Sequence, residues 1–421
     1  MRRSGHFRRV LCADGPAAIA WAALVLLPAV LAGQEITRVG NRWVMTVMGA
    51  APAASRLRVT SQGPVRVEGA SGNEVSYTAE LSVEARSQDE ARRILSQNSM
   101  HVASNKGQVV LTAPGGPVTT SLTIRAPHLK LAVIRTSEGA VEAYAIDGDL
   151  EVNSGGGDLK CDRIRGDCNL STAGGDIQVG EVGGDLQCGT AGGHITVKNV
   201  RGDAVLETAG GRVEIDHAGG DVRVDTAGGA IVVGNAAGSV AAASGGGAIE
   251  VGKAGGVVTI RAMAGPVQVG AAGGVRCESG SGGVRVSNIA GPMQVTTAIG
   301  SIIASLMAGK PSSDSFLQTG NGDVTVFIPS NLGVNIRAAA DRGRVVSEFP
   351  GIAQHRVGVR LLAEGPVNGG GPLLTIAGSG GNIISRSYSV RCSSRCASRS
   401  RPAALSCSSR WRSSNLMPEI A

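Results

Sequence analysis

The sequence predicts an all-β protein: a single-chain β-solenoid (β-helix) built from eighteen-residue, two-strand coils. Three observations support this prediction. Every ninth residue from Gly139 to Gly283 is glycine, without exception. Apolar residues follow most of these glycines at the second and fourth positions, as Ile177 and Val179 follow Gly175. The corners alternate between Thr-Ala-Gly-Gly and a Gly-Asp sequence, so two nine-residue units make one repeat.

Each nine-residue unit is expected to form one short strand. Apolar residues that alternate with polar residues indicate a strand with one buried face, so Gln178 and Thr196 should face solvent. About nine coils stacked at roughly 4.8 Å would form a rod roughly 45 Å long. The register is expected to slip by one residue after Gly265.

The flanking segments are expected to cover the ends of the stack, which would otherwise expose unpaired strand edges. A short helix is predicted over residues 87–96, with Ser87 as its N-cap and Glu90 completing a capping box. Residues 322–329 are predicted to begin a C-terminal β lid. The predicted division of the chain is 1–33 signal peptide, 34–136 N-terminal lead-in with the short helix, 137–310 β-solenoid, 311–383 C-terminal coils and lid, and 384–421 Ser/Arg-rich tail.

The N-terminus has the pattern of an export signal. Four arginines precede an apolar run from Ala17 to Ala32, which is short for a membrane span and suits a signal peptide. Cleavage is expected after Ala32 or Gly33, and an uncleaved membrane anchor is the alternative. We therefore expect an exported protein, periplasmic, cell-surface or secreted, whose mature chain does not span the membrane.

The net charge of +7 does not indicate a nucleic-acid partner. Residues 1–33 contribute +3 and residues 384–421 contribute +6, so the body of the chain carries −2. The basic excess therefore lies outside the predicted fold. Twelve serines and seven arginines crowd into the tail without a strand pattern, which predicts disorder, with a basic surface tether as the alternative.

Four cysteines occupy inward positions of the repeat: Cys161, Cys168, Cys188 and Cys277. As small apolar residues they suit a narrow core. An exported protein permits disulfides, so the sequence leaves open whether Cys161 and Cys168 are bridged.

Aspartates recur once in each full repeat and are expected to stack along one edge: Asp149, Asp167, Asp185, Asp203 and Asp221. Carboxylates about 5 Å apart repel one another, so weak divalent-cation binding is one use of such a row. A solvated row of corner residues is the favoured interpretation. The calcium-binding nonapeptide of secreted toxins does not fit, because Ile177 and Val179 replace its required glycine and aspartate.

No arrangement typical of an active site is visible. His194 and His217 are isolated at corners, and no nucleophile–base pair has a recognisable spacing. Ser154 and Ser244 lie in Ser-Gly-Gly-Gly corners rather than in a nucleophile elbow. We predict no enzyme activity, no catalytic, cofactor-binding or metal residues, no cofactor and no small-molecule substrate.

Two ligand signals are weak. No aromatic residue lies between Ala145 and Ser315, although sites for single-stranded nucleic acids use aromatic stacking platforms and sugar sites are expected to do the same. Both ligand classes are therefore less expected on the rod. Residues 165–167 and 201–203 spell the cell-adhesion tripeptide Arg-Gly-Asp, but glycine and aspartate belong to the repeat, so coincidence is the favoured interpretation.

The alternating corners, the export signal and residues 320–329 together resemble a bacterial adhesin-like domain-of-unknown-function family with β-strand repeats. The resemblance covers roughly residues 60–383 and implies a β-solenoid with no catalytic residues to carry over. The leading hypothesis is an exported, non-enzymatic scaffold or protein-interaction module of the cell envelope, which binds an unknown envelope protein or itself. The alternatives are a polysaccharide-binding or polysaccharide-active β-helix protein and a bactofilin-like self-assembling filament.

Overall fold

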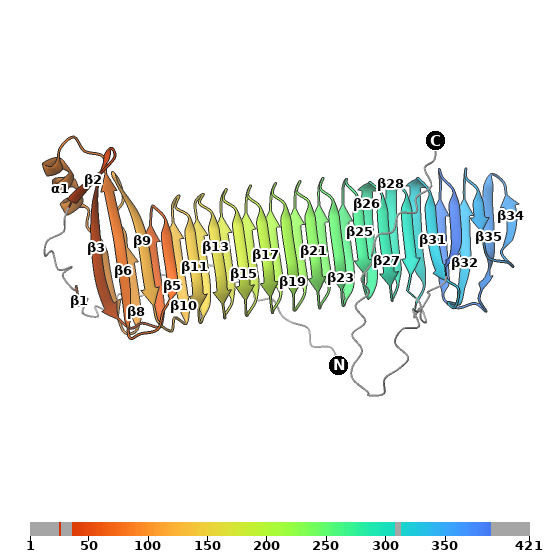
Figure 1. Ribbon diagram of the computed structural model, residues 1–421. Coiled ribbons are helices and arrows are strands. Elements are labelled where there is room, and N and C mark those ends of the chain that lie inside the picture. The colour runs from red at the N-terminus through yellow and green to blue at the C-terminus, as the bar shows by residue number, and fades with distance from the viewer. Residues whose placement is uncertain (1–24, 27–35, 308–312, 389–421) are drawn as a thin grey trace, which may run out of the picture.

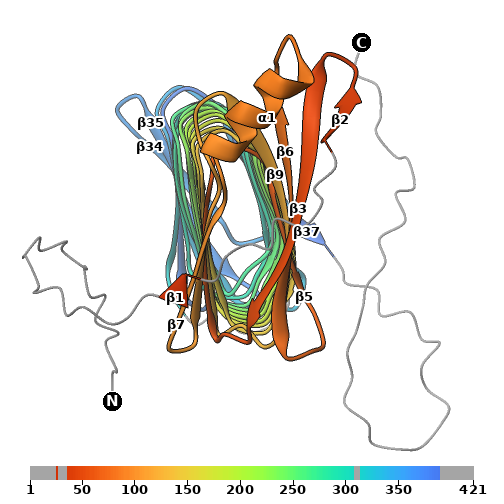
Figure 2. The same ribbon diagram turned by 90° about the vertical axis from the view of Figure 1, so that its left-hand side faces the viewer.

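The chain forms a rod of two long β-sheets that face each other across a narrow core (Figures 1 and 2). The computed structural model describes residues 25–26, 36–307 and 313–388. Successive strands alternate between the two sheets, and parallel partners lie one full repeat apart, as Leu170 and Cys188 do. The predicted β-solenoid is therefore confirmed. It has about 11 turns rather than nine, because coils continue on both sides of the glycine grid.

The regular coils supply 11 strands to each sheet. Sheet A contains β10 (Leu131–Thr136), β12 (Asp149–Ser154), β14 (Cys168–Thr172), β16 (Leu186–Thr190), β18 (Ala204–Thr208), β20 (Val222–Thr226), β22 (Val240–Ser244), β24 (Val257–Ala262), β26 (Gly274–Ser281), β28 (Met293–Ile299) and β30 (Ser315–Asn321). Sheet B contains β11 (Val141–Ile146), β13 (Leu159–Ile164), β15 (Ile177–Val182), β17 (Ile195–Val200), β19 (Val213–Ala218), β21 (Ile231–Ala236), β23 (Ile249–Ala254), β25 (Val267–Ala271), β27 (Val284–Ile289), β29 (Ile302–Leu306) and β31 (Val324–Pro329).

Strands of the central coils bury three side chains each, one more than the sequence pattern indicated. In β15 the buried residues are Ile177, Val179 and Val182, with two outward residues before the last. In sheet A the third inward position is polar, as Thr190 in β16. In the sheet B strands, buried and outward residues alternate only over the first four positions. The alternating sequence pattern therefore did not predict the third buried position. Gln178 is exposed, as predicted.

The predicted slip in register is also confirmed. Ala262 pairs with Ser279 and Val267 pairs with Val284. In this coil, paired residues are therefore one position closer in the sequence than they are in the coils before it. Gly265 lies in the shortened coil with φ +101°, a conformation that glycine adopts without steric cost.

At the N-terminal end, the coil that comes first in the chain is stacked between two coils that come later. β4 (Arg56–Ser61) and β5 (Val65–Gly69) pair in parallel with β10 and β11 on one side and with β8 (Gln108–Thr112) and β9 (Val118–Ala126) on the other. Antiparallel strands then end both sheets. These are β7 (His101–Asn105) and β1 (Val25–Leu26) in sheet A, and β6 (Glu74–Val83), β3 (Arg42–Pro52) and β2 (Ile36–Val39) in sheet B.

The single helix of the described residues, α1 (Gln88–Gln97), lies at this N-terminal end of the rod (Figures 1 and 2). The Ser87 Oγ accepts a hydrogen bond from the Glu90 backbone N–H, which confirms the predicted N-cap. The Glu90 carboxylate accepts from the Arg86 N–H, one residue before the usual capping-box donor. Ala91 and Leu95 are buried, so the helix adds to the core there.

At the C-terminal end, the last two strands are inserted between earlier ones. β36 (Leu373–Gly378) lies between β30 and β32 (Val334–Ala340), and β37 (Ile383–Tyr388) lies between β31 and β33 (Val345–Ser347). The antiparallel pair β34 (Ala353–Val357) and β35 (Arg360–Val367) ends sheet A. The loss of strand pattern expected from Ile384 is therefore wrong as far as Tyr388, because pairing with β31 holds this segment in β37.

Two predicted segments lie mainly outside the described residues. The predicted signal peptide is described only at Val25–Leu26, and the Ser/Arg-rich tail is described only as far as Tyr388. Among the described residues, no helix combines the length and the apolar character that crossing a membrane requires.

Candidate functional site

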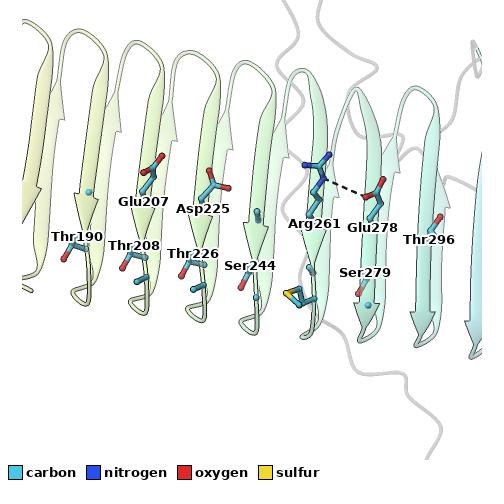
Figure 3. Close-up of a pocket in the computed structure, with 18 residues that line it drawn as sticks. Thr190, Glu207, Thr208, Asp225, Thr226, Ser244, Arg261, Glu278, Ser279 and Thr296 are labelled. Atoms are coloured by element: carbon cyan, nitrogen blue, oxygen red, sulfur yellow. Dashed lines mark ion pairs between the residues drawn. The ribbon is translucent and has the colours of Figure 1, made fainter. Parts of the chain in front are cut away.

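A shallow trough of about 1070 Å³ lies on the outer face of sheet A (Figure 3). It crosses the strands from β16 to β28, close to the Thr-Ala-Gly-Gly corners, over roughly 29 Å at one strand spacing per coil. One row of equivalent outward positions lines it: Gly189, Glu207, Asp225, Ala243, Arg261, Glu278 and Thr296.

Small side chains leave space at the middle and at one end of the trough, between its charged residues. Strand β22 presents only alanines outward, Ala241 and Ala243, and the corners below the row carry Ala209 and Ala227. Gly189 has open space where a Cβ would lie, so packing does not require glycine there. A larger outward residue would fit the fold and would fill the trough.

The charged residues of the trough are mostly acidic. Figure 3 shows the Glu207 and Asp225 carboxylates projecting from neighbouring strands. Arg261 is the single cation of the lining, and its Nε lies 3.9 Å from a carboxylate oxygen of Glu278. Glu207 forms no ion pair with any described residue. Two of the three carboxylates are balanced by arginines beside the lining, because Arg223 lies 2.7 Å from Asp225 and Arg276 lies 3.6 Å from Glu278. Glu207 is therefore the carboxylate of the trough that is available to a cationic partner.

A column of buried hydroxyls supports the lower edge of the trough. The Thr208 Oγ1 donates to the Gly193 carbonyl (3.1 Å) and accepts from the Gly211 N–H (3.1 Å). The same two bonds recur at Thr172, Thr190 and Thr226. Each hydroxyl therefore joins its own corner to the previous coil, which makes the edge of the trough rigid. The sequence showed the recurring threonine but not that it is buried.

The stacked aspartates serve the backbone. In each step one carboxylate oxygen accepts the N–H of the next aspartate, as Asp167 Oδ1 accepts from Asp185 N at 2.9 Å. The series runs from Asp149 to Ser239. These carboxylates extend the hydrogen-bond ladder of the sheets around the corner, which gives the expected corner row a structural role.

The opposite corners carry a second ladder that the sequence analysis missed. Asp158 Oδ1 accepts from the Asp176 N–H, Asp176 accepts from the His194 N–H, and His194 Nδ1 accepts from the Arg212 N–H at 2.9 Å. His194 is thus a ladder residue. The signal that could have revealed this row is the polar residue that follows Gly157, Gly175, Gly193 and Gly211.

The predicted cysteine positions are confirmed: Cys161, Cys168, Cys188 and Cys277 are all buried free thiols. A hydrogen bond to Cys168, together with burial, holds the pKa of Cys161 well above its usual range. Burial does the same for the pKa of Cys188, and it raises the pKa of Cys277 to about 12. These thiols are therefore poor nucleophiles at neutral pH.

The remaining candidates for chemistry are not brought together. Ser154 and Ser244 are buried, and their hydroxyls bond to backbone groups of the corners, as the threonines do. His217 is exposed, but it lies within strand β19 and not at a corner as predicted, because the strand continues to Ala218. Among the described ranges, no group of three or more His, Cys, Asp or Glu residues is placed to hold a metal ion.

The two Arg-Gly-Asp tripeptides lie at corners two coils apart. Their aspartates, Asp167 and Asp203, each use one carboxylate oxygen in the aspartate ladder. The Arg165 guanidinium bonds Asp147 at 2.9 Å instead of a ladder aspartate. Both aspartates and one of the two arginines of these tripeptides are thus bonded to other residues of the rod.

Comparison with known proteins identifies one family. A family model described as Toastrack DUF4097 matches residues 55–356, most of the described chain. No curated protein matches the sequence.

Similar solved structures share little sequence with the chain. A "putative adhesin" from Bacteroides fragilis is 12% identical, with a TM-score of 0.27, over 61% of this chain and 96% of that one. A "putative cell adhesion protein" from Clostridium sporogenes is 11% identical, with a TM-score of 0.17, over 82% and 100%. A "putative lipid binding protein" from Parabacteroides distasonis is 7% identical, with a TM-score of 0.24, over 82% and 97%. At this similarity, these names describe those proteins alone.

Proposed function

Because the chain belongs to the Toastrack DUF4097 family, we propose that this β-solenoid is an exported, non-enzymatic protein-interaction module of the cell envelope. The observation that carries the proposal is the trough across β16–β28. It offers a long and rigid surface that backbone ladders hold in place, and it lacks the convergent polar groups of an active site.

The trough suits an extended segment of a partner protein that carries small and basic side chains. Its small residues allow another backbone to approach closely, and its unpaired Glu207 carboxylate attracts lysine or arginine. The lining contains no aromatic ring on which a sugar could stack, which favours a protein partner over a polysaccharide.

The filament alternative is disfavoured by the ends of the rod. α1 and the antiparallel strands β6, β3 and β2 occupy the N-terminal end, and the β34–β35 hairpin ends sheet A at the other. Coils that stack end to end need bare parallel edges, whereas antiparallel hairpins and a helix block continued stacking.

A crosslinking experiment in cells tests the interaction. A photoreactive amino acid is placed at Ala243, in the centre of the trough, and in a separate variant at Val232, an outward position of sheet B in a neighbouring strand. We expect a discrete protein adduct from position 243 and none from position 232. Equal adducts from both positions, or adducts only with the protein itself, would refute a partner site in the trough.

Export is tested separately, by fractionating cells and sequencing the N-terminus of the mature protein. We expect a mature chain that begins at Gly33 or Gln34 and lies outside the cytoplasm. An intact N-terminus in the cytoplasmic fraction would refute export and leave the interaction test unaffected.

A further inference from the structure

A second hollow, of about 490 Å³, lies on the opposite long edge of the rod, beside the Gly-Asp corners. Three arginines line it, Arg163, Arg165 and Arg201, together with the carboxylates Asp147 and Glu181. We call this hollow the arginine notch. Its size falls within the usual range of ligand pockets, and its lining holds three guanidinium groups and two carboxylates.

The notch exists because one position in a column of corner residues is glycine. Arg165, Gly183 and Arg201 occupy equivalent positions of three successive coils, so the two arginines stand two strand spacings apart, roughly 9–10 Å. A Cβ at Gly183 would overlap the Arg165 carbonyl, so no side chain fits between them. The backbone therefore fixes the gap.

The three arginines differ in how strongly they are engaged. Arg165 bonds Asp147 at 2.9 Å, and Arg163 lies 3.6 Å from Asp162. The Asp162 carboxylate is itself held by the Glu181 N–H. Arg201 is exposed and forms no ion pair with any described residue. Glu181 is the other charged residue of the lining without such an ion pair, so Arg201 is the cation of the notch that is free to bind an incoming anion.

We propose that the arginine notch binds a carboxylate side chain of an acidic peptide segment, with Arg201 as its main contact. The planar guanidinium matches a carboxylate in a two-bond fork, which a lysine cannot reproduce. A peptide fits better than an acidic glycan because no aromatic ring lines the notch. The site is separate from the trough and does not depend on it.

Fluorescence anisotropy with a fluorescein-labelled hexaglutamate peptide tests this proposal. It is measured in the full chain and in a chain ending at Tyr388, which retains every described strand. We expect Arg201→Ala to weaken binding by roughly tenfold, and Arg201→Lys to recover only part of the loss. Arg285→Ala is the matched control, because Arg285 is exposed on sheet B and pairs with no described residue. It should bind as the wild type does.

Three results would overturn the proposal. The first is unchanged binding in Arg201→Ala, and the second is an equal loss in Arg285→Ala, which would indicate non-specific attraction. The third is tighter, Arg201-dependent binding of an oligogalacturonate of equal charge, which would assign the notch to an acidic glycan. None of these results bears on the trough.

Discussion

At the scale of single residues, the two glycines of each Thr-Ala-Gly-Gly corner have different roles. A Cβ at Gly211 would overlap the Gly193 carbonyl of the previous coil, whereas a Cβ at Gly210 would meet open space. The second glycine is therefore required by the stacking distance, and the first is not.

We predict that Gly211→Ala lowers the free energy of unfolding by roughly 1–3 kcal/mol or more, because the corner must move away from its neighbour. The matched variant Gly210→Ala should stay within roughly 0.5 kcal/mol of the wild type. Urea unfolding of the two variants measures this difference. Equal losses would contradict the steric argument.

The buried thiols predict both reactivity and pH dependence. A chain of residues 34–388 contains four cysteines, all buried, so Ellman's reagent should detect none at pH 8 in this chain when it is native and four when it is denatured. Detection of two in denaturant would instead indicate a disulfide between two of them.

The raised pKa of Cys277 also predicts how stability changes with pH. A thiol whose pKa is about 12 in the folded chain and roughly 8.5 in the unfolded chain stabilises the fold fully below the lower value. This contribution is lost as the pH rises toward 12. We therefore expect stability to fall across that interval, and Cys277→Ala to reduce the fall, as measured by urea midpoints between pH 8 and pH 11.

The sequence predicted the inward cysteines and the aspartate row because both follow the repeat. It could not show the backbone bonds of the carboxylates or the buried threonines. Their partners lie in the neighbouring coil, 15 or 18 residues away, and only the register of stacking brings them together.

At the scale of elements, the last coil closes the C-terminal end. β36 and β37 pair on both sides, with β30 and β31 toward the rod and with β32 and β33 toward the end. Without them, β32 and β33 would lose their contact with the solenoid. The sequence predicted the strand at β31 but not this insertion, because the pairing joins segments more than three repeats apart in the chain.

We predict that a chain ending at Gly371 loses stability and exposes apolar surface, because removal of β36 and β37 leaves strands unpaired on both sides. A chain ending at Tyr388 retains all described strands and should melt as the full chain does. Thermal melting and binding of a hydrophobic dye compare the two. Similar melting temperatures for both truncations would contradict a closing role of the last coil.

At the scale of the whole molecule, the aspartate row is a structural ladder, so calcium should leave the melting temperature unchanged. Each carboxylate already accepts a backbone hydrogen bond, and no metal-binding group was found among the described residues. Calorimetry with and without calcium measures this. A rise of several degrees would mean that the row binds the ion.

The β-solenoid architecture followed from the sequence because its repeat is short and nearly perfect. The trough did not. It depends on a few small outward residues, such as Gly189 and Ala243, among the charged residues of seven adjacent strands, and the repeat pattern constrains only the inward positions.

The affinity of the partner crosslinked at the trough, measured against three purified chains, tests the central claim most directly. Ala243→Arg fills the trough and lowers its negative charge, and Val232→Arg adds the same side chain to the opposite face. We predict that Ala243→Arg weakens binding by roughly tenfold or more, while Val232→Arg binds as the wild type does. Unchanged binding by Ala243→Arg would contradict the assignment of the trough as the interaction surface.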